Sequence, residues 1–160
     1  MSESKSPTTL KPATVEVRVP SRLGFEKVVM STAASVAKLM GFRDDRIEDL
    51  KTAVAEACIN AIEHGNRLNE KLSVGVVLSA SVDALEVKVM DEGKGMNRQP
   101  GKLDKLKKPD LDRKMRGEEV PRGMGMFLIQ ALVDEAEWVA GDEANSSYVR
   151  LVIRLDKNAE

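Results

Sequence analysis

Cysteine and long apolar runs are both scarce in this chain of 160 residues. The single cysteine, Cys58, excludes a disulfide framework within the chain. No apolar run approaches the roughly 20 residues needed to cross a bilayer, and the polar N-terminus lacks the apolar core of a signal peptide. The formal net charge is −1, which gives no indication of a nucleic-acid or membrane partner. We therefore expect a cytoplasmic protein that binds neither nucleic acid nor membrane directly.

The composition that remains is typical of a folded domain. Hydrophobic residues make up 42% of the sequence, and the length suits one domain with a core of its own. Residues 1–12 are rich in Ser, Thr, Lys and Pro, which predicts a flexible N-terminal tail. The domain itself is expected over residues 13–156.

Hydrophobic periodicity predicts an α+β fold. Alternation in "TVEVRVP" indicates a half-buried strand. Ser21 is a candidate N-cap for the first helix, and Gly41 is its expected stop. Hairpin-linked strands favour a two-layer α/β sandwich, with a mixed, mainly antiparallel sheet and helices on one face. The predicted elements are a strand at 14–20, helices at 22–40 and 44–65, strands at 72–80 and 84–91, a helix from 125, and strands within 135–141 and 146–155.

The stretch "AEACINAIEHGN" places polar residues on the second predicted helix. Glu56, Asn60 and Glu63 fall together on a helical wheel, roughly opposite the apolar face. An Asn carbonyl can bind Mg²⁺ without adding charge beside a phosphate, and a Glu one turn earlier can act as a general base. A solvated polar face explains the same pattern, so the pair alone leaves both interpretations open.

A second motif follows the strand "ALEVKVMD". Asp91 stands at the strand end, where a carboxylate can accept a hydrogen bond from an exocyclic amine such as that of adenine. Gly93 and Gly95 allow a close approach of the backbone to a ligand. The sequence "DEGKG" is also an ordinary turn.

A third motif, "RGMGMFLIQAL", has Gly123 and Gly125 at the start of an apolar helix. Free N–H groups at a helix N-terminus can bind a phosphate, although a flexible helix entry is the alternative. No run ending in Gly-Lys-Ser or Gly-Lys-Thr is present in the sequence, so a P-loop enzyme is not supported.

Taken in order, the three motifs resemble the Bergerat ATP-binding fold of the GHKL superfamily. Within it, the chain is most similar to the anti-sigma-factor serine kinases of the RsbW type. The resemblance runs from about Val15 to Leu155, and "GFRDDRIEDLKTAVAEACINAIEHGN" and "RGMGMFLIQALVDE" are its most specific pieces.

The resemblance implies a role for each matching residue. Glu56 corresponds to the general base and Asn60 to the Mg²⁺ ligand. Residues 97–121 correspond to a mobile lid over the triphosphate. The remaining nucleotide contacts are Asp91 for adenine, Gly93 and Gly95 for its pocket, and Arg122, Gly123 and Gly125 for the phosphates.

Two positions depart from the family pattern. The family has Gly-Thr before its last strand, where this chain has "NSSYV", so Ser147 takes the role of the Thr hydroxyl. Relatives often carry an Arg on the first helix that contacts a sigma factor. An ungapped alignment places Met30 there, with Lys27 one turn earlier. The sequence therefore supports nucleotide binding better than it supports a sigma factor as the partner.

The resemblance implies a homodimeric protein serine kinase that uses ATP and Mg²⁺. It would sequester a sigma factor and phosphorylate a serine of a STAS-domain antagonist. Two alternatives are a kinase of the same type without a sigma target and a nucleotide-gated binding module with little catalysis. A histidine kinase is disfavoured because the chain has one histidine and no room for a phosphoacceptor domain.

Overall fold

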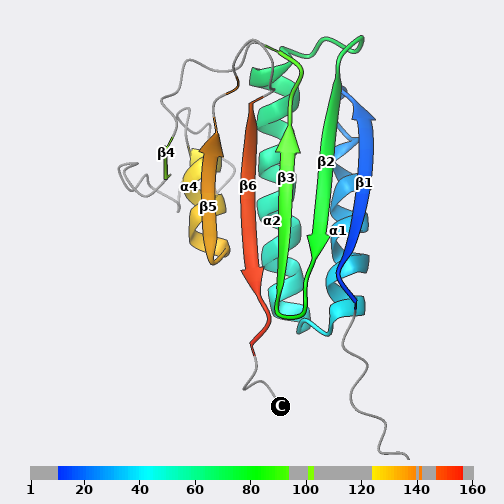
Figure 1. Cartoon of the computed structure of the whole chain (residues 1–160). Coiled ribbons are helices and arrows are strands. Elements are labelled where there is room, and N and C mark those ends of the chain that lie inside the picture. Colours follow the sequence, from blue (N-terminus) through cyan, green and yellow to red (C-terminus); the bar gives the residue numbers. More distant parts are fainter. Residues whose placement is uncertain (1–10, 94–100, 103–123, 140, 142–146, 157–160) are drawn as a thin grey trace, which may run out of the picture.

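The protein folds into an antiparallel sheet with helices packed on one of its faces (Figure 1). The computed structural model describes residues 11–93, 101–102, 124–139, 141 and 147–156. Strand order is β1-β2-β3-β6-β5-β4, and every pairing among the described strands is antiparallel. The predicted α+β two-layer sandwich is thereby confirmed. The elements are β1 (Ala13–Pro20), α1 (Glu26–Met40), α2 (Asp44–Asn60), η1 (Ala61–Gly65), β2 (Ser73–Ala80), β3 (Ala84–Met90), β4 (Gly101–Lys102), α4 (Met124–Leu132), β5 (Glu135–Val139) and β6 (Tyr148–Arg154).

The core lies between the sheet and the helices, and alternation along the strands builds it. Every second residue of β2 and β3 is buried, which places Val76, Leu78 and Val87 against the helix layer. From the helices, Leu50 and Ile129 are fully buried in the same cluster. The apolar residues that recur at every second position of the strands and about every 3.6 positions of the helices therefore pack into the same hydrophobic core.

Helix α1 begins later than predicted. It starts at Glu26, and the segment before it is a turn in which Gly24 has a φ of 106°. Ser21 is not its N-cap: the Ser21 hydroxyl donates to the carbonyl of Leu72 at 2.8 Å. The predicted stop is confirmed, since Gly41 has a φ of 93° and donates its N–H to carbonyls of the last turn.

Helix α2 begins at Asp44, where two aspartates favour a helix N-terminus. The helical path runs to Gly65 as predicted, but its last five residues form a π-helical turn, η1. The N–H of Asn66 accordingly bonds to the carbonyl of Ala61 at 2.8 Å, five residues earlier. A π turn widens the helix and is frequent at functional sites. The residues "EHG" of the first motif lie in this π turn, and Asn66 follows it directly.

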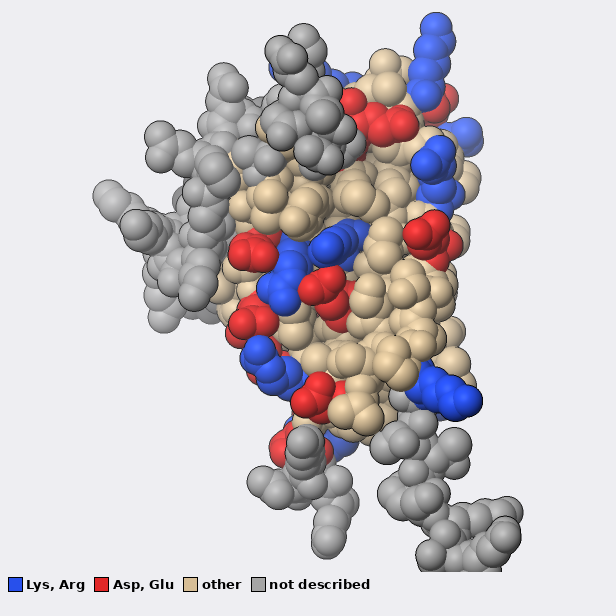
Figure 2. All heavy atoms as spheres, in the orientation of Figure 1, with Lys and Arg blue, Asp and Glu red and all other residues tan. Residues whose placement is uncertain are grey.

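The sheet face without helices carries a network of ion pairs (Figure 2). Arg150 on β6 lies 2.6 Å from Glu86 on β3 and 3.5 Å from Glu137 on β5. These partners alternate with the inward-facing residues, so one face is apolar and the other is solvated. In the part of the chain that the structure describes, no helix is long and apolar enough to cross a bilayer.

Several predicted features lie outside the described residues. These include the tail at 1–10 and most of the predicted lid at 97–121. One part of that segment is described: Gly101–Lys102 form β4, which pairs with Trp138 and Glu137 of β5. The segment was expected to contain no strand, so this short pairing is an addition to the prediction. The site candidates outside the described residues are Gly95, Arg122 and Gly123.

Candidate active site

A pocket opens between α2, α4 and the adjoining ends of β3 and β6. It encloses about 300 Å³ of space, part of which is continuous with solvent. Asn60 and Asp91, both singled out from the sequence, line it together although they come from different elements. The remaining lining residues are Ala57, Ala61, Val89, Met126, Trp138, Tyr148 and Val149.

Asp91 contributes a buried carboxylate to this pocket. Its Oδ1 is buried and has no hydrogen-bond partner among the described residues. Burial raises the pKa of Asp91 to about 6, against an opposing hydrogen bond from the backbone of Gly93. A buried acceptor without a donor is costly in the free protein. An exocyclic amine such as that of adenine would supply a donor for this oxygen.

Two glycines bring the backbone against Asp91. A Cβ added at Gly65 would lie 2.5 Å from Asp91 Oδ2 and 2.7 Å from Asp91 Cβ. A Cβ added at Gly93 would lie 1.8 Å from the carbonyl oxygen of Gly65. Real Cβ atoms do not approach other atoms so closely, so the π turn and the segment after β3 fit together only because both positions are glycine.

Asn66 holds this segment in place and was not predicted as a site residue. Its side chain is 2% exposed and makes four hydrogen bonds. Nδ2 donates to the Ser21 hydroxyl and to the Ser73 carbonyl, while Oδ1 accepts the N–H groups of Glu92 and Gly93. A buried amide must be fully bonded, but the burial of this residue cannot be seen in the sequence, so no sequence signal singled it out.

We expect Asn66→Asp to destabilise the protein. The change replaces the donor atom by an oxygen that faces the Ser73 carbonyl, so a buried acceptor loses its donor. We expect a loss of about 2 to 4 kcal/mol in the free energy of unfolding, measured in urea. Asn69→Asp is the matched control, because Asn69 is exposed and its side-chain oxygen accepts from Lys71 N–H. Equal stabilities of the two variants would contradict this role.

Glu56 and Asn60 are half-buried and lie against the start of α4. A Cβ added at Gly125 would lie 2.6 Å from Glu56 Oε2 and 3.4 Å from Asn60 Nδ2. Asn60 Nδ2 also donates to the sulfur of Met126 at 3.3 Å. The third glycine motif thus meets the "EACIN" helix directly. The structure brings together Glu56, Asn60 and Gly125 on one side and Asp91 and Gly93 on the other.

The donor set around Asn60 suits a magnesium ion that arrives with phosphate. No group of three or more His, Cys, Asp or Glu side chains that could hold a metal occurs within the described ranges. Mg²⁺ often takes one or two protein ligands and completes its shell with waters and substrate phosphates. Because Asn60 Nδ2 donates to Met126, its carbonyl oxygen is the atom available for a cation. The residues present therefore fit Mg²⁺ bound together with a nucleotide.

Ser147 lies at the edge of the site and acts on it through the backbone. Its carbonyl accepts the N–H of Asp91 at 3.4 Å, and its hydroxyl accepts the N–H of Gly141 at 3.0 Å. The side chain is 7% exposed. The predicted contact between this hydroxyl and a nucleotide stays a prediction.

The raised pKa of Asp91 leads to a prediction about stability. Above pH 6 the folded protein holds a buried carboxylate that is better solvated when unfolded, so this group lowers stability as pH rises from about 4 to 6. Asp91→Asn should therefore stabilise the nucleotide-free protein at pH 8 and not at pH 4. Since Asp91 keeps partial exposure, we expect about 1 to 2 kcal/mol. Thermal melts at both pH values measure it, and an equal effect at both would contradict the prediction.

The fold and the pocket define a class of ATP-binding domains, and sequence comparison agrees. The family model described as a histidine kinase-like ATPase domain matches residues 19–153. The chain belongs to this family, within the group of RsbW serine-protein kinases.

Two RsbW proteins and one solved structure illustrate the similarity. "Serine-protein kinase RsbW" of Bacillus subtilis (strain 168) is 34% identical over 125 residues, which cover 76% of this chain and 74% of that protein. The protein of the same name from Halalkalibacterium halodurans is 34% identical over 132 residues, covering 79% and 76%. A crystal structure of the RsbU and RsbW domains of a Mycobacterium tuberculosis protein superposes with a TM-score of 0.59 at 18% identity. The superposition covers 92% of this chain and 34% of the longer chain in that crystal structure. At this level of identity the match shows the fold alone.

Proposed function

We propose that this protein is an ATP-dependent protein serine kinase and anti-sigma factor. The observation that carries the nucleotide assignment is the buried Oδ1 of Asp91, which lacks a donor in a pocket shared with Asn60. An adenine amine satisfies this oxygen at one end of the pocket. At the other end, α4 begins against Glu56 and Asn60, where its N-terminal N–H groups suit phosphate.

Phosphoryl transfer would take place at the end of the site where Glu56 and Asn60 meet α4. Bound Mg²⁺ would supply positive charge that neutralises the phosphates during transfer. Asn60 would hold that ion through its carbonyl oxygen. Glu56 would orient the incoming serine hydroxyl and accept its proton as the oxygen attacks the γ-phosphorus, while the bond from that phosphorus to the β,γ-bridging oxygen breaks and ADP leaves. Gly125 lets the start of α4 pack directly against the Glu56 carboxylate, since any side chain there would collide with it.

The partners in this proposal are those of the RsbW group. A sigma factor would be sequestered, and a STAS-domain antagonist would be phosphorylated on a serine, with the kinase acting as a homodimer. On α1, Lys27 is exposed and Met30 is half-buried. Lys27 is therefore the better placed of the two for contact with a sigma factor.

A pull-down with nucleotide tests the whole proposal. The tagged protein is incubated with a lysate of its host in the presence of Mg-ATP, Mg-ADP or no nucleotide, and retained proteins are mapped for phosphoserine. We expect a sigma factor that is retained with nucleotide, and a STAS-domain protein that gains one phosphoserine with ATP only. A sigma factor retained without any phosphorylation would favour the nucleotide-gated binding module. A phosphorylated STAS protein without a retained sigma factor would favour a kinase with another target.

A further inference from the structure

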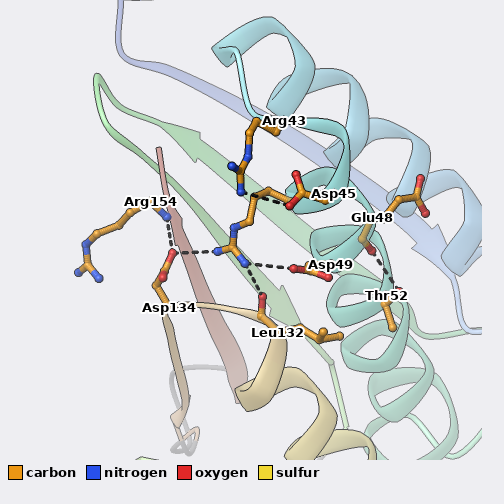
Figure 3. Close-up of polar contacts among 9 residues, drawn as sticks. Arg43, Asp45, Glu48, Asp49, Thr52, Leu132, Asp134 and Arg154 are labelled. Carbon is orange, nitrogen blue, oxygen red and sulfur yellow. Dashed lines mark hydrogen bonds and ion pairs between the residues drawn. The ribbon is translucent and has the colours of Figure 1, made fainter. Parts of the chain in front are cut away.

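Arg46 joins α2 to the end of α4 and to the segment that follows it, at the end of the helix layer away from the pocket. Its guanidinium donates to Asp49 at 3.2 Å, to the carbonyl of Leu132 at 3.2 Å and to Asp134 at 3.1 Å. Figure 3 shows these dashed contacts converging between the start of α2 and the end of α4. Asp134 also accepts the N–H of Arg154 at 2.6 Å, which adds β6 to the cluster.

The contact with Leu132 supplies something that α4 lacks. The last four carbonyls of a helix have no partner within it, and a cation there is favourable. Helix α4 has no basic residue in its own last turn. Arg46 provides the cation from α2, and with 24% of its side chain exposed it is only partly hydrated. A guanidinium can reach all three acceptors because its donors form a planar fork.

The other end of α4 is the end that meets the active site. There Gly125 fits against Glu56, and Met126 accepts from Asn60. The helix is therefore attached to α2 at both ends, by Arg46 near its last residue and by the active-site residues near its first. Its rise of about 1.5 Å per residue means that a slide by one residue would bring a side chain against Glu56 in place of Gly125.

We propose that Arg46 is a positioning residue for phosphate binding, which sets where the N-terminus of α4 lies over Glu56 and Asn60. The burial of Met126 and Ile129 holds α4 against the helix layer through the hydrophobic effect, which is non-directional. The Arg46 fork does have direction, and its acceptors come from α2 itself, from α4 and from the segment that follows α4. This inference rests on the proposed nucleotide site.

The test compares the affinities of two nucleotides in two matched variants. Arg46→Met removes the fork and keeps the length of the side chain. Arg43→Met removes a neighbouring arginine whose guanidinium pairs with the exposed Asp45 of α2 rather than with α4. For each protein, calorimetry measures the affinity of the non-hydrolysable analogue Mg-AMP-PNP and of AMP, which lacks the two outer phosphates.

We expect Arg46→Met to weaken AMP-PNP binding about tenfold while AMP binding changes less than about twofold. Arg43→Met should match wild type for both ligands. Arg46→Lys keeps the charge without the fork, so its AMP-PNP affinity should fall between those of wild type and Arg46→Met. Should Arg46→Met not fold, AMP-PNP and AMP affinities are compared in Arg46→Lys and Asp134→Asn instead, where we expect a smaller loss of AMP-PNP affinity.

Two results would overturn the inference. One is a lowered melting temperature with unchanged affinity for both nucleotides, which is what a purely structural arginine would give. The other is an equal loss for AMP and AMP-PNP. Failure of wild type to bind either nucleotide would instead contradict the proposed function, so the two failures are distinguishable.

Discussion

Glu56→Gln is expected to lower the rate of phosphotransfer by about 10² to 10⁴ while ATP affinity stays near that of wild type. Gln has the same shape, so the fit against Gly125 is kept. It cannot accept the proton of the incoming hydroxyl. The measurement is a single-turnover transfer of labelled phosphate from ATP to the STAS-domain substrate, together with ATP affinity by calorimetry.

The matched control for this experiment is Glu63→Gln. Glu63 is on the same stretch of helix, but its carboxylate lies 3.8 Å from the His64 ring rather than under α4. It should transfer phosphate at the wild-type rate. If Glu56→Gln were as active as Glu63→Gln, the general-base role of Glu56 would be wrong.

Gly65→Ala is expected to weaken ADP binding by about 10- to 100-fold. The added methyl group would lie 2.5 to 2.7 Å from three atoms of Asp91, so the carboxylate must leave its place in the pocket. Gly65 has no positive φ, so alanine is compatible with the backbone there. Because the clash includes Asp91 Cβ, the segment after β3 must shift as well, so we expect a loss of stability beside the loss of binding. Calorimetry measures the affinity for ADP, and urea unfolding followed by circular dichroism measures the stability.

Gly75→Ala provides the comparison for that result. Gly75 lies on β2, and an added Cβ would be 3.5 Å from the end of the Met90 side chain, an ordinary contact. ADP affinity should stay at the wild-type value. Equal affinity of Gly65→Ala and wild type would show that Asp91 does not need its observed position to bind the base.

The fold could be predicted because its signals are local. Alternation of Val with Glu and Arg marks β1, and the glycine at 41 ends α1 as expected. The start of α1 could not be predicted in the same way. Ser21 has the chemistry of an N-cap, but its hydroxyl bonds to Leu72 and Asn66 instead. Tertiary hydrogen bonds, which join residues about 50 positions apart, overrode the local preference.

In the site, too, the residues within local motifs could be predicted, and those fixed by tertiary contacts could not. Asp91, Asn60 and Glu56 belong to recognisable motifs, and the structure places all three around one region. Asn66 was missed because its importance comes from four hydrogen-bond partners on three segments far from one another in the sequence, which no spacing rule reveals. The π turn also has no composition signal of its own, although it sets the contact between Gly65 and Asp91.

Calorimetric titration of wild type with Mg-ADP and with Mg-GDP is the most direct test of the adenine site. Adenine presents an amine at the position where guanine presents a carbonyl oxygen. The buried Oδ1 of Asp91 can accept from the first and is repelled by the second. At pH 8 we predict saturable binding of Mg-ADP, with Mg-GDP bound at least about tenfold more weakly. Absence of binding by Mg-ADP, or equal affinity for both nucleotides, would contradict the assignment of this pocket.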